Sequence, residues 1–293
     1  MKRNQKSKMD RFRHGLATAF ACAVVLGVPV LTVMQFWHPH SDTRKATPLA
    51  ALHVRSIDNT SVAPKLFQQP LISVTFDDGF ESTYKDALPA LQKHGIHTTQ
   101  YILSGVEKNP LYLSWDQVRA IQKAGHEIGC HSITHPDLTT LSSKEVMQQL
   151  TGCKTTMEKE VGTSVTDFAS PYGAENAGTL ADMKKVYATQ RNVYGDSSNG
   201  VSNLDVNTSA NFNPLDITGM TIKHDTSLAE IQALVDFTVK NNGWLVLTYH
   251  QADDGPSKYA LDASKLDEQM NLLEHAPVRI VTVHQAMSGW KAK

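Results

Sequence analysis

The sequence predicts an α/β fold in which helices cover a parallel sheet that curls into a barrel. From residue 70 onward, short apolar segments rich in β-branched residues alternate with segments of helical period. The strand-like segments are apolar on both faces, as in a buried parallel sheet. Polar residues follow several of these segments, and in folds of this class the active site lies at the carboxyl ends of the strands.

Net charge and cysteine spacing exclude two classes of function. The 293 residues include 28 Lys and Arg and 29 Asp and Glu, so the formal charge is −1. Because no basic stripe follows the first 13 residues, nucleic acid is not a predicted partner. Cys22, Cys130 and Cys153 form no C-x-x-C pair, so a cysteine metal site is not predicted either.

The N-terminal region has the pattern of a membrane anchor. Residues 1–14 are basic, and residues 15–37 carry no charge. A helix of that length is about 35 Å long, enough to cross a hydrocarbon core of ~30 Å. The cations before the span favour a cytoplasmic N-terminus with the rest of the chain outside. A cleaved signal peptide is the alternative, but bulky residues stand where a cleavage site needs small ones.

A linker and one globular domain follow the span. Residues 38–68 are polar, contain prolines and have no sustained period, which predicts a linker or stalk. Residues 69–293 form the predicted domain. Its strands are expected at residues 71–76, 98–103, 126–131, 166–169, 190–194, 217–222, 244–249 and 278–283. Its helices are expected at residues 84–94, 115–123, 142–161, 179–187, 227–242 and 265–274.

Two adjacent carboxylates end the first expected strand. The apolar run from Leu71 to Phe76 is followed by Asp77, Asp78 and Gly79, and glycine permits a sharp turn. Consecutive side chains on extended backbone point in opposite directions, so one carboxylate can bind a cation while the other accepts a proton. Taken alone, Asp-Asp-Gly is more often an ordinary turn.

Histidines at two other strand ends favour the metal interpretation. His131 and His135 follow the third expected strand, and His250 follows the seventh. With Asp78, the first two supply N, N and O ligands and leave a position open for water. A single H-x-x-x-H pattern is a weak signal in a chain with 13 His, but its combination with Asp77 and Asp78 is specific. We therefore predict that Asp78, His131 and His135 bind one metal ion beside Asp77.

These motifs resemble those of the polysaccharide deacetylases of the NodB-homology type, carbohydrate esterase family 4. Residues 75–79 resemble the first motif and residues 131–136 the second. Residues 171–173 resemble the latter part of the third motif, and residues 247–250 the last. The motifs occur in the family's order between residues 70 and 285. The resemblance implies a distorted (β/α)7 barrel.

The resemblance also implies an enzyme that hydrolyses N-acetyl or O-acetyl groups of a polysaccharide. The divalent ion would be zinc, with cobalt, nickel or manganese as alternatives. Asp77 would be the general base and His250 the general acid. Pro171 and Tyr172 would contact the substrate, with the Tyr172 backbone N–H as a donor to the oxyanion.

The predicted anchor restricts the expected substrate and location. An outward-facing tether favours a cell-wall or surface glycan, such as peptidoglycan or poly-N-acetylglucosamine. We expect a single-pass protein of the cell membrane with an extracytoplasmic catalytic domain. The expected partners are an acetylated polysaccharide and the lipid bilayer, through residues 15–37, and no protein partner is predicted.

The sequence departs from the family in the third motif. The family usually has an arginine two residues before the proline, oriented onto the base, and this chain has Ala169 there. Arg191 on the next strand is a candidate replacement, although a structural arginine is an equal alternative. Asp196 is a candidate to orient His250, with a solvated loop aspartate as the alternative.

Three questions stay open at the level of sequence. A catalytically inactive glycan-binding module is the alternative function suggested by Ala169. A non-haem iron oxygenase would use the same ligand types but leaves Asp77 without a role. Cys130 should face the helix that contains Cys153, where the two form either a disulfide or two buried thiols.

Overall fold

The description covers residues 67–195 and 200–290 of a computed structural model. The predicted basic tail (1–14), the predicted span (15–37) and nearly all of the predicted linker (38–68) lie outside these residues. Within the described part of the chain, no helix is both long and apolar enough to cross a membrane. The membrane anchor therefore stays a prediction.

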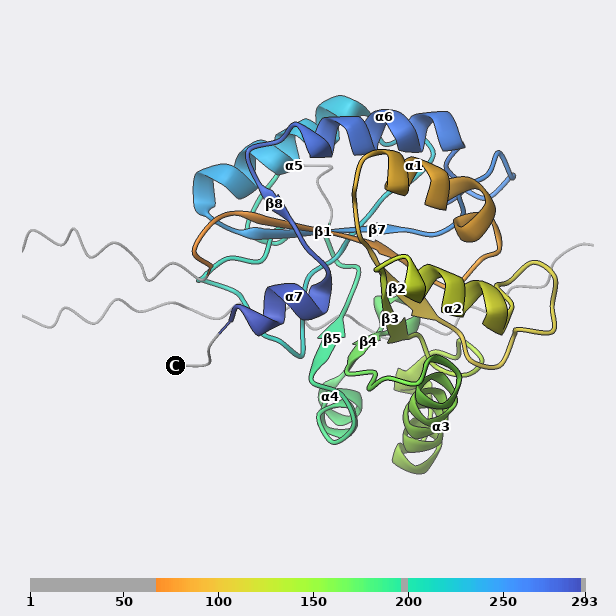
Figure 1. The fold of residues 1–293 in the computed structure, drawn as a ribbon. Helices are drawn as coiled ribbons and strands as arrows, with labels where there is room; N and C mark the ends of the chain where they lie inside the picture. The colour runs from red at the N-terminus through yellow and green to blue at the C-terminus, as the bar shows by residue number, and fades with distance from the viewer. Residues whose placement is uncertain (1–66, 196–199, 291–293) are drawn as a thin grey trace, which may run out of the picture. The chain divides into compact units, whose positions relative to one another are not determined.

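The domain is built on one parallel sheet of eight strands, as expected for an α/β fold (Figure 1). The strand order is β5-β4-β3-β2-β1-β7-β6, and β8 pairs with β1 beside this path. The strands are β1 (Leu71–Phe76), β2 (Thr99–Ile102), β3 (Glu127–Cys130), β4 (Asp167–Ala169), β5 (Thr189–Arg191), β6 (Met220–Thr221), β7 (Trp244–Tyr249) and β8 (Arg279–Ile280).

The sheet curls, but its two ends are not joined by a regular ladder. In the described residues, the β5 side and the β6 side meet only through isolated parallel bridges, Arg191 with Ile217 and Gly195 with Met220. The arrangement is a curled parallel half-barrel, which confirms the expected α/β class and the coarse form of the distorted (β/α)7 barrel. The strands expected at 190–194 and 217–222 are shorter in the structure. Of the first, only residues up to Arg191 pair with β4, and of the second, only Met220 and Thr221 pair with β7.

Helices cover the outer face of the sheet (Figure 1). The longest, α3, begins at a Ser142–Glu145 capping box and ends at Gly162, which has the left-handed backbone that favours glycine. Its buried side chains recur at helical spacing and join the core beside β3. The helices are α1 (Leu88–Lys93), α2 (Trp115–Lys123), α3 (Ser143–Val161), α4 (Ala177–Met183), α5 (Leu228–Asn241), α6 (Ala263–Glu274) and α7 (Val283–Ser288).

The expected last strand, 278–283, is wrong in its second half. Only Arg279 and Ile280 pair with β1, and the chain then enters α7. The β-branched residues favour a strand by propensity, but Thr282 accepts a hydrogen bond from the Gln285 N–H and starts a helix instead. The Val283 N–H also donates to Thr99 Oγ1, which holds the start of α7 against β2.

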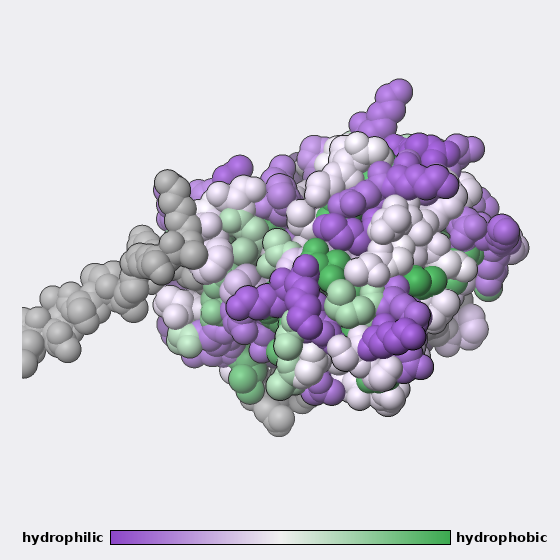
Figure 2. Space-filling model, turned by 90° about the horizontal axis from the view of Figure 1, so that it is seen from below, coloured by the Kyte–Doolittle hydropathy of each residue, from purple (hydrophilic) through white to green (hydrophobic). Residues whose placement is uncertain are grey.

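Cys130 and Cys153 are both free and buried, so the thiol alternative holds in this structure. They belong to the apolar core between the sheet and α3, as the strand alternation predicted. On the face shown in Figure 2, hydrophilic residues predominate and apolar residues form only small patches.

Candidate metal centre and active site

The carboxyl ends of the central strands bring the predicted ligands together. Asp78 Oδ1 lies 3.5 Å from His131 Nε2 and 3.5 Å from His135 Nε2. One potential ligand atom from each of these residues lies within 4.8 Å of the others. Asp78 and two histidines more than fifty positions later in the chain therefore form one N, N, O donor set, as predicted.

The two histidines are in the state that a metal ligand requires. His131 Nδ1 bonds to the Ala169 carbonyl oxygen at 2.9 Å, which places the proton on Nδ1 and leaves the Nε2 lone pair toward Asp78. Burial lowers the pKa of His131 to about 3 and also lowers the pKa of His135, so both rings are neutral at physiological pH. Neutral imidazoles are the form that coordinates metal ions.

The third candidate ligand, Asp78, has a raised pKa. Burial and the neighbouring Asp77 carboxylate raise the pKa of Asp78 to about 7. A divalent cation would offset that repulsion and keep the carboxylate ionised. The donor types, their spacing and this unbalanced charge all fit a metal ion, whose identity the residues alone do not decide.

Strained backbone is concentrated at this site. Of the five non-glycine residues with positive φ in the described chain, four are Asp78, Ser132, His135 and Tyr172. Such conformations cost about 1–3 kcal/mol each and persist where the surroundings enforce them. Gly79 is also left-handed, and a side chain there would place a carbon 2.9 Å from Ile102 Cγ2. The turn after β1 therefore needs its glycine.

Asp77 contacts Arg191, the candidate partner that the sequence suggested. Arg191 Nη2 lies 2.5 Å from Asp77 Oδ1 and 2.6 Å from Oδ2, and both side chains are buried. Burial by itself would raise the pKa of Asp77, but the charge and hydrogen bond of Arg191 outweigh it and lower that pKa. Asp77 is therefore ionised at neutral pH.

Ala169 and Arg191 are register partners on β4 and β5. In a parallel sheet, paired residues project on the same side at a separation of about 5 Å. Arg191 thus reaches Asp77 from the strand beside the position where the family usually has its arginine. Its guanidinium carbon lies 5.0 Å from the centre of the Tyr101 ring, and Nη1 donates to the Asn192 carbonyl.

Of the remaining predicted residues, Tyr172 and His250 line a cavity of about 230 Å³ around the candidate metal ligands, which we call the inner cavity. Pro171 and Tyr172 form a tight turn after β4, and the Tyr172 ring packs 4.4 Å from the His135 ring. Asp196 lies outside the described residues, so its predicted role is untested. The inner cavity is lined by Asp77, Asp78, His131, His135, Ser170, Tyr172, Gly173, Val193, Thr221, His250 and Tyr259.

His250 reaches the inner cavity from the end of β7. Burial lowers its pKa, opposed by the Asp77 carboxylate. Its Nδ1 is buried and has no hydrogen-bond partner among the described residues. The ring instead stacks on Tyr259, with centroids 4.9 Å apart and an interplanar angle of 24°. Sequence reasoning missed Tyr259, which lies in no motif that we used.

Comparison with known proteins agrees with the geometry. Residues 66–190 match a family model described as polysaccharide deacetylase. PdaC of Bacillus subtilis, a peptidoglycan-N-acetylmuramic acid deacetylase, is 37% identical over 118 residues, 40% of this chain and 24% of PdaC. PgdA of Listeria monocytogenes, a peptidoglycan-N-acetylglucosamine deacetylase, is 34% identical over 115 residues, 39% of this chain and 24% of PgdA. This chain contains a polysaccharide deacetylase domain of the NodB, carbohydrate esterase family 4 type.

Solved structures agree on the fold of this deacetylase domain. The Xyl-CE4 domain of a multidomain xylanase from the hindgut metagenome of Trinervitermes trinervoides has a TM-score of 0.53 and 20% identity, covering 75% of this chain and 90% of that chain. The chain spans only 24% of the length of each of the two curated relatives named above. The family match ends at residue 190, so Arg191, His250 and Tyr259 are placed at the site by the structure alone.

Proposed function

We propose that the deacetylase domain is a metal-dependent hydrolase of N-acetyl or O-acetyl groups in a cell-wall or surface polysaccharide, such as peptidoglycan or poly-N-acetylglucosamine. The observation that carries this proposal is the convergence of Asp78, His131 and His135 beside the ionised Asp77. The names of the two relatives support the substrate class, since both are peptidoglycan deacetylases.

Zinc is the proposed metal, with cobalt, nickel or manganese as alternatives, because two imidazoles and one carboxylate are a common donor set of catalytic zinc. Asp78, His131 and His135 would hold the ion. When bound, it would supply Lewis-acid chemistry, which lowers the pKa of water and polarises a carbonyl oxygen.

The side chains around the ligands have complementary tasks. Asp77 accepts the proton of the attacking water, and Arg191 holds the carboxylate ionised and in place. The Tyr172 N–H donates to the oxyanion that forms on the acetyl group, a contribution of about 3–4 kcal/mol for one such donor. Pro171 restricts the backbone that presents this N–H.

His250 completes the reaction as the acid. In its imidazolium form it donates a proton to the sugar nitrogen as the carbon–nitrogen bond breaks, which yields acetate and a free amine. Because burial lowers the pKa of His250, the imidazolium form is populated only on the acid side of neutrality. Asp77, whose pKa is also low, stays ionised there, so the two groups hold opposite protonation states over a shared pH range.

The proposed location is the outer side of the cell membrane, with residues 15–37 as a single-pass anchor and a cytoplasmic N-terminus. The basic residues before an uncharged stretch of spanning length support this orientation. An acetylated surface polysaccharide would then lie within reach of the tethered domain.

Acetate release tests the function. The full-length protein, purified in detergent, is incubated with peptidoglycan, poly-N-acetylglucosamine, chitin oligomers and acetylated xylan, with and without a chelator. We expect acetate from at least one polymer, loss of release with chelator and recovery with added zinc. Binding of these polymers without acetate release under any metal would instead support a glycan-binding module.

A further inference from the structure

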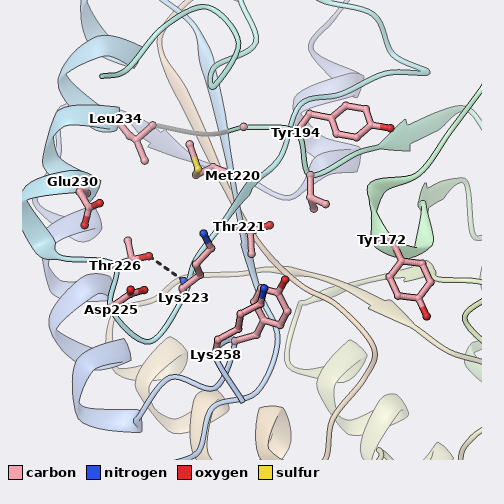
Figure 3. Close-up of a pocket in the computed structure, with 13 residues that line it drawn as sticks. Tyr172, Tyr194, Met220, Thr221, Lys223, Asp225, Thr226, Glu230, Leu234 and Lys258 are labelled. Atoms are coloured by element: carbon pink, nitrogen blue, oxygen red, sulfur yellow. Dashed lines mark hydrogen bonds between the residues drawn. The ribbon is translucent and has the colours of Figure 1, made fainter. Parts of the chain in front are cut away.

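Tyr259 lines two adjoining cavities. It borders the inner cavity together with His250. It also borders a second cavity of about 500 Å³, which we call the outer cavity and into which Lys223 and Lys258 extend (Figure 3). Tyr172 and Thr221 also line both. A side chain in this position faces the candidate metal ligands on one side and the outer cavity on the other.

The contact between Tyr259 and His250 is a ring stack. The centroids lie 4.9 Å apart, and the planes are inclined by only 24°. Parallel rings at this separation restrict rotation of the imidazole about its bond to the backbone. Lys258 Nζ lies 4.8 Å from the centre of the Tyr259 ring.

The backbone holds the two rings in register. Gln251, next to His250, forms a parallel bridge with Ala260, next to Tyr259. The Leu261 N–H donates to the Gln251 carbonyl at 3.0 Å, and the Tyr259 N–H donates to Ser257 Oγ at 3.2 Å. The loop that carries Tyr259 is therefore fastened to the segment that carries His250, and the stack does not depend on a freely moving loop.

A hydrogen bond to the second ring nitrogen is the usual means of orienting a catalytic histidine. In the described residues, the buried Nδ1 of His250 has no such partner. The titratable groups around this ring are Asp77, Arg191 and His135. Among the described residues, the ring stack with Tyr259 is therefore the contact that defines the plane of the imidazole.

We propose that Tyr259 is a positioning residue that orients the His250 imidazole through the contact between their rings. This inference rests on the proposed function, in which His250 protonates the leaving group. It assigns to Tyr259 the task that a carboxylate performs for many catalytic histidines. Asp196, which lies outside the described residues, is the competing assignment.

The first test is independent of activity. The His250 Cε1–H signal in the NMR spectrum of histidine-labelled protein is assigned with His250→Gln and compared in Tyr259→Phe and Tyr259→Leu. The ring current of a stacked phenol should be retained in the phenylalanine variant and lost in the leucine variant. An unchanged signal in folded Tyr259→Leu overturns the proposal. Tyr259→Met provides a second variant without an aromatic ring.

The second test uses the leaving group. Acetate release from an N-acetylated oligosaccharide requires protonation of the amine, whereas release from 4-nitrophenyl acetate does not. We expect Tyr259→Leu to lower kcat for the amide by about tenfold with little change in KM, and to change ester hydrolysis less than about twofold. Tyr259→Phe, which keeps the aromatic ring, should retain most of the wild-type kcat for the amide. Equal losses on both substrates would overturn the positioning role.

Two further variants separate the competing explanations. In the His250→Ala background, Tyr259→Leu should have no additional effect on the amide, because the group that it orients is absent. Asp196→Ala should leave the ratio of amide to ester hydrolysis rates unchanged. If Asp196→Ala lowers the amide rate selectively and Tyr259→Leu does not, the assignment to Tyr259 is overturned. A wild-type protein that releases no acetate would refute the proposed function, while the NMR comparison would still decide the stack.

Discussion

Arg191 and Asp77, 114 positions apart in the chain, form a fully buried ion pair in which Nη2 lies 2.5 Å from Oδ1 and 2.6 Å from Oδ2. The pair joins the ends of β1 and β5 across the interior of the curled sheet. It also explains how Asp77 remains ionised despite burial, since the arginine outweighs the desolvation of the carboxylate.

Arg191→Met should destabilise the domain and impair catalysis. Removing one partner leaves an uncompensated buried charge, a loss of about 3–5 kcal/mol in the free energy of unfolding. Burial then raises the pKa of Asp77, so the acid limb of the rate profile should move to higher pH. Urea denaturation and a pH–rate profile measure the two effects. The double variant Asp77→Asn/Arg191→Met should recover part of the stability, and a loss equal to that of Arg191→Met alone contradicts the pairing.

An arginine at position 169 on β4 should be able to replace Arg191 on β5 as the partner of Asp77. Because Ala169 and Arg191 are register partners, an arginine at position 169 projects on the same side of the sheet as Arg191. We expect Ala169→Arg/Arg191→Ala to be more active than Arg191→Ala alone, measured as kcat for acetate release. Ala169→Lys/Arg191→Ala is the matched control, since lysine cannot offer the same planar group. A folded arginine double variant without any recovery would count against the exchange.

Substitution of the two adjacent carboxylates should affect different properties: kcat for Asp77 and zinc affinity for Asp78. Asp77→Asn should lower kcat by about 10²–10⁴ and leave zinc affinity close to that of the wild type, because Asp77 moves a proton and binds no metal. Asp78→Asn should weaken zinc binding by more than about 100-fold, since even residues behind the ligands contribute 10- to 100-fold. Chelator competition measures the affinities. Wild-type activity in Asp77→Asn would remove the base assignment.

A buried acid at the opposite end of the sheet should make stability depend on pH. Burial and Asp167 raise the pKa of Glu127 to about 8. A raised folded-state pKa stabilises the domain below the unfolded value of about 4.5, and this contribution is lost as pH rises through about 8. Glu127→Gln cannot ionise, so it should melt at a higher temperature than wild type near pH 9 and at a similar one near pH 5.

Glu268→Gln, an exposed substitution on α6, is the control for the pH experiment. It should follow the wild-type melting curve at both pH values. If Glu127→Gln loses stability with rising pH as steeply as wild type, another group is responsible. Thr99 Oγ1 and the His284 N–H both donate to Glu127 Oε2, and an amide oxygen can accept the same hydrogen bonds.

The ligand triad could be predicted because each ligand follows a locally recognisable strand. The apolar run of β1 and the short strand β3 end at Asp78 and His131, and the carboxyl ends of strands in a parallel sheet meet at one edge. The capping box that starts α3 was equally local, since its two residues are three positions apart. Such patterns need no knowledge of distant contacts.

The sequence by itself therefore determined the class of fold, the order of its main elements and the three residues of the candidate metal site. Only the tertiary structure decided that Arg191 reaches Asp77, because that contact depends on the register of β4 and β5. It also placed Tyr259 on His250, through a loop whose path no local periodicity encodes. Local propensity specifies strands and turns over a few residues, whereas contacts between distant side chains follow from how the complete sheet packs and closes.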